Sequence, residues 1–143
     1  MNREIFYKQA FNLKGGDFIK AGSASVQIKR ILKEIGLSSD IIYRVAICCY
    51  EAEMNVIMYA DKAEIDFSIT PEEINIIFND EGKGIENIEL AMKEGFSTAT
   101  NAMREMGFGA GMGLPNIKKN SDEFNIESVV SKGTKLSIKI FLN

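Results

Sequence analysis

The sequence predicts a two-layer α/β (α+β) sandwich, in which helices cover one face of a mixed, mostly antiparallel sheet. Stretches with alternating apolar residues occur in the middle and at the end of the chain, and stretches with helical spacing precede them. Strands with a single apolar face need a second layer to bury it, and the helices supply that layer. With 143 residues, 45% of them hydrophobic, residues 1–143 are expected to form a single domain.

The first third of the chain is expected to contain an edge strand and a helix. Residues 5–13 could form the strand, and Gly15 and Gly16 would make the turn that ends it. Residues 24–35 carry apolar side chains at helical spacing, and Gly36 follows them as a C-terminal cap.

A second, longer helix is expected over about residues 40–59, with Ser38 or Ser39 as its N-terminal cap. This helix is apolar on nearly all sides, which favours burial against the sheet over a place on the surface. It contains both cysteines, Cys48 and Cys49, whose side chains point about 100° apart and cannot easily pair. The pattern therefore indicates buried free thiols in a reducing cytoplasm.

Two hairpins with one buried face each are expected to form most of the sheet. Residues 63–78 alternate between apolar and polar side chains on both sides of a turn at residues 71–73. Residues 124–142 repeat this pattern around a turn at residues 131–133.

Composition argues against several classes of function. The net charge of -3 and the pI of about 5.1 give no large positive field for binding nucleic acid. We expect neither a membrane span nor a signal peptide, and therefore a cytoplasmic location. The chain has no histidine, which excludes a histidine base, a histidine-containing metal site and a phosphorylated imidazole. Chemistry must therefore rest on carboxylates, amides, hydroxyls and backbone groups.

Polar residues of the second expected helix fall in defined directions. At 100° per residue, Glu51 and Asn55 lie in one narrow stripe with Arg44 and Cys48, whereas Glu53 is rotated about 200° from Glu51. Glu51 and Asn55 can therefore converge on one ligand, and Glu53 cannot join them. In a purely structural alternative, Glu51 pairs with Arg44, and Asn55 hydrogen-bonds a neighbouring backbone group.

A second candidate group is Asp80-Glu81-Gly82-Lys83-Gly84, which follows directly after an expected strand. A carboxylate fixed at a strand end can accept a hydrogen bond from an exocyclic amine. Gly82 and Gly84 would let the backbone pass close to a flat ring. An ordinary turn would explain the same residue types.

The third candidate group is the alternating-glycine stretch over residues 107–114, which runs into an expected helix over residues 115–120. Free N–H groups and the positive end of a helix dipole suit a polyphosphate. The stretch fits neither a Walker A loop nor the dinucleotide fingerprint. A flexible hinge would explain the glycines but not their strict alternation.

In their order along the chain, these groups resemble the GHKL (Bergerat-fold) ATPases. The matches to the N, G1, G2 and G3 boxes of that family are Glu51-x-x-x-Asn55, Asp80-x-Gly82-x-Gly84, Gly109-x-Gly111-x-Gly113 and Gly133-Thr134. The resemblance covers roughly residues 41–142. Each match is weak alone, but four matches in the right order make a strong combined signal.

The resemblance implies a role for each matching residue, with ATP and Mg²⁺ as the bound species. Asn55 would bind Mg²⁺ through its amide oxygen, and Glu51 would orient or deprotonate the attacking hydroxyl. Asp80 would bind adenine, assisted by Thr134. Residues 94–106 would close over the phosphates as a lid. The other implied nucleotide-binding residues are Gly82, Gly84, Gly109, Gly111, Gly113 and Leu114.

Within the family, the small size and residues 94–98, 109–116 and 122–124 look closest to bacterial anti-sigma and stressosome switch kinases. Those proteins phosphorylate serine or threonine on small partners of the anti-sigma-antagonist (STAS) type. The implied function is a serine/threonine kinase of a partner-switching pathway, and a homodimer is compatible with it. Residues 99–106 lengthen the lid relative to the compact switch kinases.

Two other functions fit the same residues. One is an anti-sigma factor that sequesters a sigma factor, and the other is a nucleotide-gated binding module without phosphoryl transfer. A sensor histidine kinase is disfavoured because the chain has no histidine.

Overall fold

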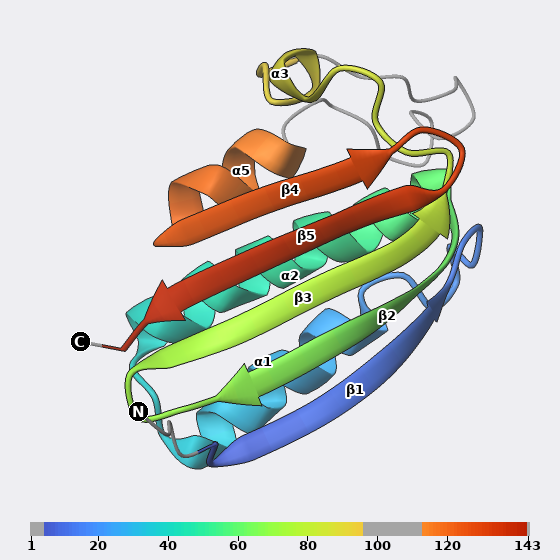
Figure 1. The fold of residues 1–143 in the computed structure, drawn as a ribbon. Helices are drawn as coiled ribbons and strands as arrows, with labels where there is room; N and C mark the ends of the chain where they lie inside the picture. Colours follow the sequence, from blue (N-terminus) through green and yellow to red (C-terminus); the bar gives the residue numbers. More distant parts are fainter. Residues whose placement is uncertain (1–4, 96–112, 143) are drawn as a thin grey trace.

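The computed structural model describes residues 5–95 and 113–142. Within these residues, five strands form one sheet in the order β1-β2-β3-β5-β4, and each neighbouring pair of these strands is antiparallel. Helices α1, α2 and α5 lie on one side of the sheet, and the short helix α3 lies beyond its end (Figure 1). The prediction of a two-layer sandwich with a mostly antiparallel sheet is confirmed.

The strands are β1 (Tyr7–Lys14), β2 (Ala60–Ile69), β3 (Glu73–Gly82), β4 (Glu123–Val129) and β5 (Gly133–Phe141). The helices are α1 (Ser23–Ile35), α2 (Ser39–Tyr59), α3 (Ile88–Ala91) and α5 (Gly113–Asn120). Helix α3 was not predicted. Strand β3 continues well beyond its predicted end because it pairs with β2 up to the partners Ala60 and Gly82. Among the described helices, none has the length and hydropathy needed to cross a bilayer.

The predicted helix caps are both present. Gly36 adopts a left-handed conformation (φ 89°), and its N–H donates to the carbonyl oxygens of Leu32 and Lys33 at the end of α1. The Ser38 hydroxyl oxygen accepts from the N–H of Ile41 at the start of α2. These local signals could be identified in the sequence because a cap depends on residues that are close together in the chain.

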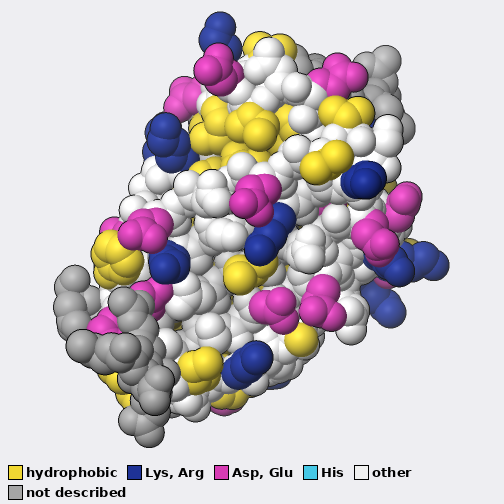
Figure 2. Space-filling model, in the orientation of Figure 1, with side chains coloured by type: hydrophobic (Ala, Val, Ile, Leu, Met, Phe, Trp, Pro, Cys, Tyr) yellow, Lys and Arg dark blue, Asp and Glu magenta, His cyan; other side chains and the backbone are white. Residues whose placement is uncertain are grey.

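The core lies between the sheet and the helices. On β2, Ile65 and Phe67 are fully buried against the helices, while Glu64 and Asp66 point to the other face. None of the described helices lies on that other face, and charged side chains are spread across it (Figure 2). The period-two pattern of the sequence therefore separates a buried face from a solvated one.

The two cysteines are free and buried, as predicted. Burial raises the pKa of the Cys48 thiol to about 12, and it raises the pKa of Cys49 well above its ordinary value. Neither thiol therefore provides a thiolate nucleophile at neutral pH.

Glu53 holds the start of α1 in place. Its Oε2 accepts from the backbone N–H groups of Gly22 (3.0 Å) and Ala24 (3.3 Å). Its Oε1 accepts from the N–H (3.0 Å) and the hydroxyl (2.7 Å) of Ser25. The cap position of α1 is Gly22, which has no side chain to satisfy the first N–H groups of the helix. The buried Glu53 carboxylate therefore acts as a cap supplied by another helix, a role that the sequence did not reveal.

Candidate nucleotide-binding site

Helix α5 packs antiparallel to α2, along the polar stripe that the sequence predicted. At one end of the stripe, Arg44 Nε donates to the carbonyl oxygen of Asn120 at 3.0 Å. Arg44 Nη2 also lies 3.1 Å from Asp122 Oδ2. The cation thus interacts with the C-terminal end of α5, where the helix dipole is negative. The alternative in which Arg44 pairs with Glu51 is therefore wrong.

At the other end of the stripe, Glu51 and Asn55 face the start of α5. Glu51 Oε2 accepts from the side-chain amide of Asn116 at 3.1 Å. A Cβ atom placed on Gly113 would lie 3.3 Å from Asn55 Oδ1 and 3.8 Å from Glu51 Oε2. The predicted pair therefore converges, and it does so at the residue where the glycine stretch enters a helix.

This end of the stripe has the chemistry that Mg²⁺ prefers. Magnesium is a hard ion that takes oxygen ligands and usually keeps only one or two from protein, leaving the rest to phosphate and water. Asn55 can supply an amide oxygen, and in the described part of the chain no group hydrogen-bonds its side chain. The described residues contain no cluster of three acidic or cysteine ligands, so a complete protein cage is absent from them. The residues fit an ion held largely by phosphate oxygens.

Asn55→Ala tests this role for Asn55. We expect ATP affinity to fall by about 10- to 100-fold or more in Mg²⁺, because even an indirect metal contact is worth that much. In EDTA the affinity should change little, because the adenine contacts remain. Calorimetric titration in both buffers measures the difference, and an equal loss in the two would contradict a metal role.

The second half of the site lies where β3 meets β5. Asp80, near the end of β3, accepts the backbone N–H of Thr134 on its Oδ1 at 2.9 Å. A Cβ atom on Gly133 would lie only 2.1 Å from the Asp80 carbonyl oxygen, so this position requires glycine. Burial raises the pKa of the Asp80 carboxyl, and the Thr134 hydrogen bond opposes that rise. A half-buried acceptor beside a fixed strand end is suited to an amine of a flat ring.

Ser128 belongs to this corner and was missed in the sequence. Its Oγ accepts the N–H of Ile85 at 2.8 Å and lies 2.8 Å from Thr134 Oγ1. It therefore fixes the Thr134 hydroxyl and ties the chain after Gly84 to the β4–β5 hairpin. A signal was present, because Ser128 is polar at an inward position of an otherwise alternating strand.

The glycines of the Asp80 segment pack against the protein's own backbone. A Cβ atom on Gly82 would lie 2.9 Å from Ala60 Cα, and one on Gly84 would lie 2.5 Å from the Val129 carbonyl oxygen. Gly84 also has a positive φ of 75°. These contacts explain both glycines without a ligand, so their approach to a ring stays a prediction.

Tyr59 connects the two halves of the site. It lies one helical turn beyond Asn55 on α2. The Lys83 ammonium is 4.8 Å from the centre of the Tyr59 ring, and a Cβ atom on Gly82 would lie 3.2 Å from the Tyr59 carbonyl oxygen. The Asp80 corner and the Asn55 corner therefore border the same end of α2.

Part of the predicted site lies outside the described residues. This holds for Gly109, Gly111 and residues 96–106 of the predicted lid. Leu114 is described, and its side chain is buried in the core, so only its backbone could contact a nucleotide. Glu94, at the start of the predicted lid, pairs with Lys119 of α5 at 2.7 Å.

Asp80→Asn separates the predicted nucleotide contact of Asp80 from its effect on stability. The pKa of Asp80 is raised in the folded state, so folding favours its protonated form, and the ionised form costs stability once the pH exceeds that pKa. The variant should therefore be at least as stable as the parent at pH 7. This advantage should shrink as the pH falls through the raised pKa and vanish below 3.8.

The same variant should bind ADP more weakly, by about 1 to 3 kcal/mol, because the amide loses an ionic acceptor for the adenine amine. The preference for ADP over GDP should become smaller as well, since guanine carries a carbonyl group where adenine carries its amine. Urea titrations across pH and nucleotide titrations measure the two effects. Unchanged ADP affinity would show that adenine does not bind at Asp80.

Comparison with known proteins identifies the class to which this fold and site belong. Residues 20–140 match the histidine kinase-like ATPase domain, and the chain belongs to this family. The resemblance to GHKL ATPases is thereby confirmed.

Curated relatives narrow the likeness further. The serine/threonine-protein kinase RsbT of Bacillus subtilis is 31% identical over 112 residues, which are 76% of this chain and 78% of the relative. An anti-sigma F factor of Clostridium kluyveri is 30% identical over 125 residues, 84% of each chain. An anti-sigma F factor of Thermoanaerobacter pseudethanolicus is 42% identical over 66 residues, 46% of this chain and 43% of the relative. The likeness to switch kinases and anti-sigma factors is confirmed.

Proposed function

We propose that this chain is a Mg²⁺-dependent serine/threonine kinase that phosphorylates a small STAS-type protein in a partner-switching pathway of the cytoplasm. The observation that carries the proposal is the convergence of Glu51, Asn55 and Gly113 at the start of α5. ATP, bound with Mg²⁺, supplies the phosphoryl group for transfer. A hard-ion ligand, a carboxylate and a helix start at one place are the parts that such a transfer needs.

Each residue has a distinct task in the proposed reaction. Asp80 accepts from the adenine amine, and Thr134 holds Asp80 in place through its backbone N–H. Asn55 would hold Mg²⁺ through its amide oxygen. Glu51 accepts the proton of the attacking serine or threonine hydroxyl, or orients that hydroxyl. Asn116 donates to Glu51 Oε2 and so fixes the direction in which the carboxylate faces.

The relatives support the type of reaction. One of them is named a serine/threonine-protein kinase, and the others are named anti-sigma F factors. Sequestration of a sigma factor is therefore the second candidate function, and it is compatible with kinase activity in the same chain. A nucleotide-gated module without phosphoryl transfer is the third, and it predicts ATP binding alone.

The experiment that tests the proposal is a transfer assay with a panel of purified STAS-domain proteins from the same genome. The chain is incubated with Mg²⁺ and γ-labelled ATP, and mass spectrometry then locates the phosphate. We expect phosphoserine or phosphothreonine on at least one member. ATP binding without transfer to any member would favour the gated module, and stable capture of a purified sigma factor would support the anti-sigma function.

A further inference from the structure

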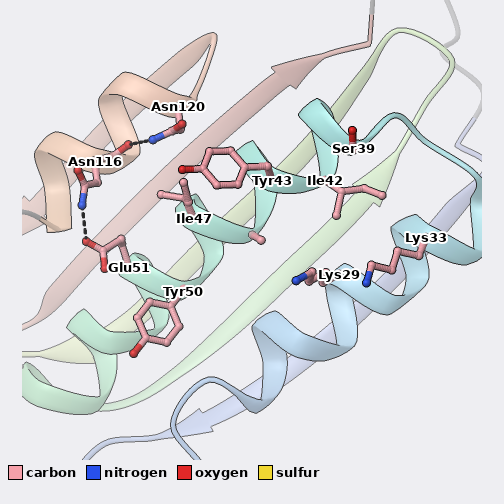
Figure 3. A pocket seen from close by; sticks show the side chains of 11 residues that line it. Lys29, Lys33, Ser39, Ile42, Tyr43, Ile47, Tyr50, Glu51, Asn116 and Asn120 are labelled. Atoms are coloured by element: carbon pink, nitrogen blue, oxygen red, sulfur yellow. Dashed lines mark hydrogen bonds between the residues drawn. The ribbon is translucent and has the colours of Figure 1, made fainter. Parts of the chain in front are cut away.

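A groove of about 750 Å³ runs over the outer face of α2, between α1 and α5 (Figure 3). Tyr43, Ile47 and Tyr50 of α2 form its floor. The side chains on its α1 wall and its α5 wall are Lys29, Lys33, Asn116 and Asn120. The sequence predicted that this helix, apolar on nearly all sides, is buried against the sheet. The face that lines the groove is the exception, because α1 and α5 do not meet over it.

The groove floor exposes aromatic surface. Tyr43 is 64% exposed and Tyr50 is 45% exposed, although most other residues of α2 are buried or half-buried. Tyrosine is enriched at the centres of protein interfaces because its ring gives a large contact area at a low entropy cost. Two tyrosines on the open face of a core helix thus indicate a contact surface.

The α1 wall of the groove is positively charged. Lys29 and Lys33 lie one turn apart on α1, and both are exposed. In the part of the chain that the structure describes, neither lysine has an ion-pair partner. Glu51 is the only acidic residue among the described residues that line the groove. On a chain of net charge -3, the groove is therefore suited to an acidic occupant.

One end of the groove reaches the proposed catalytic carboxylate. Glu51 lines the groove, and Figure 3 shows its hydrogen bond to Asn116 across from α5. A protein segment that lies along the floor therefore brings its own side chains within reach of Glu51. The groove is continuous with the place where the phosphoryl acceptor must enter.

We propose that this groove is the docking site for the protein substrate, and that it takes a surface segment with acidic side chains near the acceptor hydroxyl. Carboxylates of that segment pair with Lys29 and Lys33, and its apolar side chains cover Tyr43. The acceptor hydroxyl then lies at Glu51. This inference rests on the proposed kinase function and assigns the recognition of its substrate to residues outside the motifs.

The test uses the STAS-domain protein that the wild type phosphorylates in the panel assay. Reversing both charges with Lys29→Glu and Lys33→Glu should raise the KM for that protein about tenfold or more, with kcat and ADP affinity unchanged. Tyr43→Ala should raise the same KM, since its exposed ring can be removed without opening the core. The matched control reverses Lys8 and Lys14, two exposed lysines on the open face of β1.

The outcomes distinguish a failure of the docking proposal from a failure of the proposed kinase function. If replacing acidic residues of the partner with lysine restores the wild-type KM of the Lys29→Glu, Lys33→Glu variant, the charge pairing is established. If the KM stays at the wild-type value both in the Lys29→Glu, Lys33→Glu variant and in Tyr43→Ala, the groove is not the docking site, although the kinase function stands. If the reversal instead changes only the self-association of the chain, the groove is a contact between copies. If the wild type phosphorylates no panel member, the proposed function fails and the docking proposal fails with it.

Discussion

Glu51→Ala is expected to reduce phosphoryl transfer by about 100-fold or more, if Glu51 acts as a general base, while ADP affinity persists. The substitution removes the carboxylate that faces the start of α5 but leaves Asn55 and the Asp80 corner in place. Binding and chemistry should therefore separate in this variant. The measurement pairs a single-turnover transfer assay with calorimetric titration of ADP.

Two further variants sharpen the test. Glu51→Gln keeps an oxygen that can accept from Asn116 but cannot take a proton. If its transfer rate falls as far as that of Glu51→Ala, Glu51 acts by proton transfer. A smaller fall in the transfer rate indicates that Glu51 positions the hydroxyl. Glu127→Gln, an exposed carboxylate on β4, is the control and should transfer normally. If Glu51→Ala transfers at the wild-type rate, Glu51 has only a structural role.

Glu53→Ala is expected to lower the free energy of unfolding by roughly 3 to 5 kcal/mol. The carboxylate is fully buried and accepts from three backbone N–H groups and a hydroxyl at the start of α1. Without it these donors lose their acceptors, and each buried unsatisfied donor costs about 1 to 3 kcal/mol before water or relaxation recovers part of the loss. Such a loss is a large fraction of the stability of a domain of this size.

Urea denaturation measures this effect, and Glu53→Gln serves as its comparison. The glutamine keeps one acceptor oxygen, so its loss should be clearly smaller than that of alanine. Equal stability of Glu53→Ala and the parent would mean that α1 does not depend on this cap. Although Glu53 points away from Glu51, it cannot serve as a silent control in activity assays, because its removal disturbs the fold.

The sequence predicted those features that depend on residues close together in the chain. Helical geometry placed Glu51 and Asn55 in one stripe, and the structure shows that the stripe faces α5. The same geometry gave the direction of Glu53 but not what lies there, because its partners come from a segment about 30 residues earlier in the chain. The partner of Arg44 was mispredicted for a similar reason, since Asp122 reaches it only through the packing of α5.

The surroundings of Asp80 show the same limit. Asp80 was identified from its place beside two glycines, but the glycines turned out to be packed against Ala60 and the β4–β5 hairpin. The inward position of Ser128 could be read from the alternating pattern, but its role could not, because it depends on Ile85, after β3, and Thr134, on β5. Contacts between distant segments are set by packing, and no local pattern reports them.

The most direct measurement of the central claim is a crystal structure of the chain with Mg²⁺ and a non-hydrolysable ATP analogue. We expect the adenine amine within hydrogen-bonding distance of the Asp80 carboxylate, the ion on the Asn55 amide oxygen and the terminal phosphate next to Glu51. A nucleotide bound away from Asp80, or an ion without contact to Asn55, would contradict the site described for this chain.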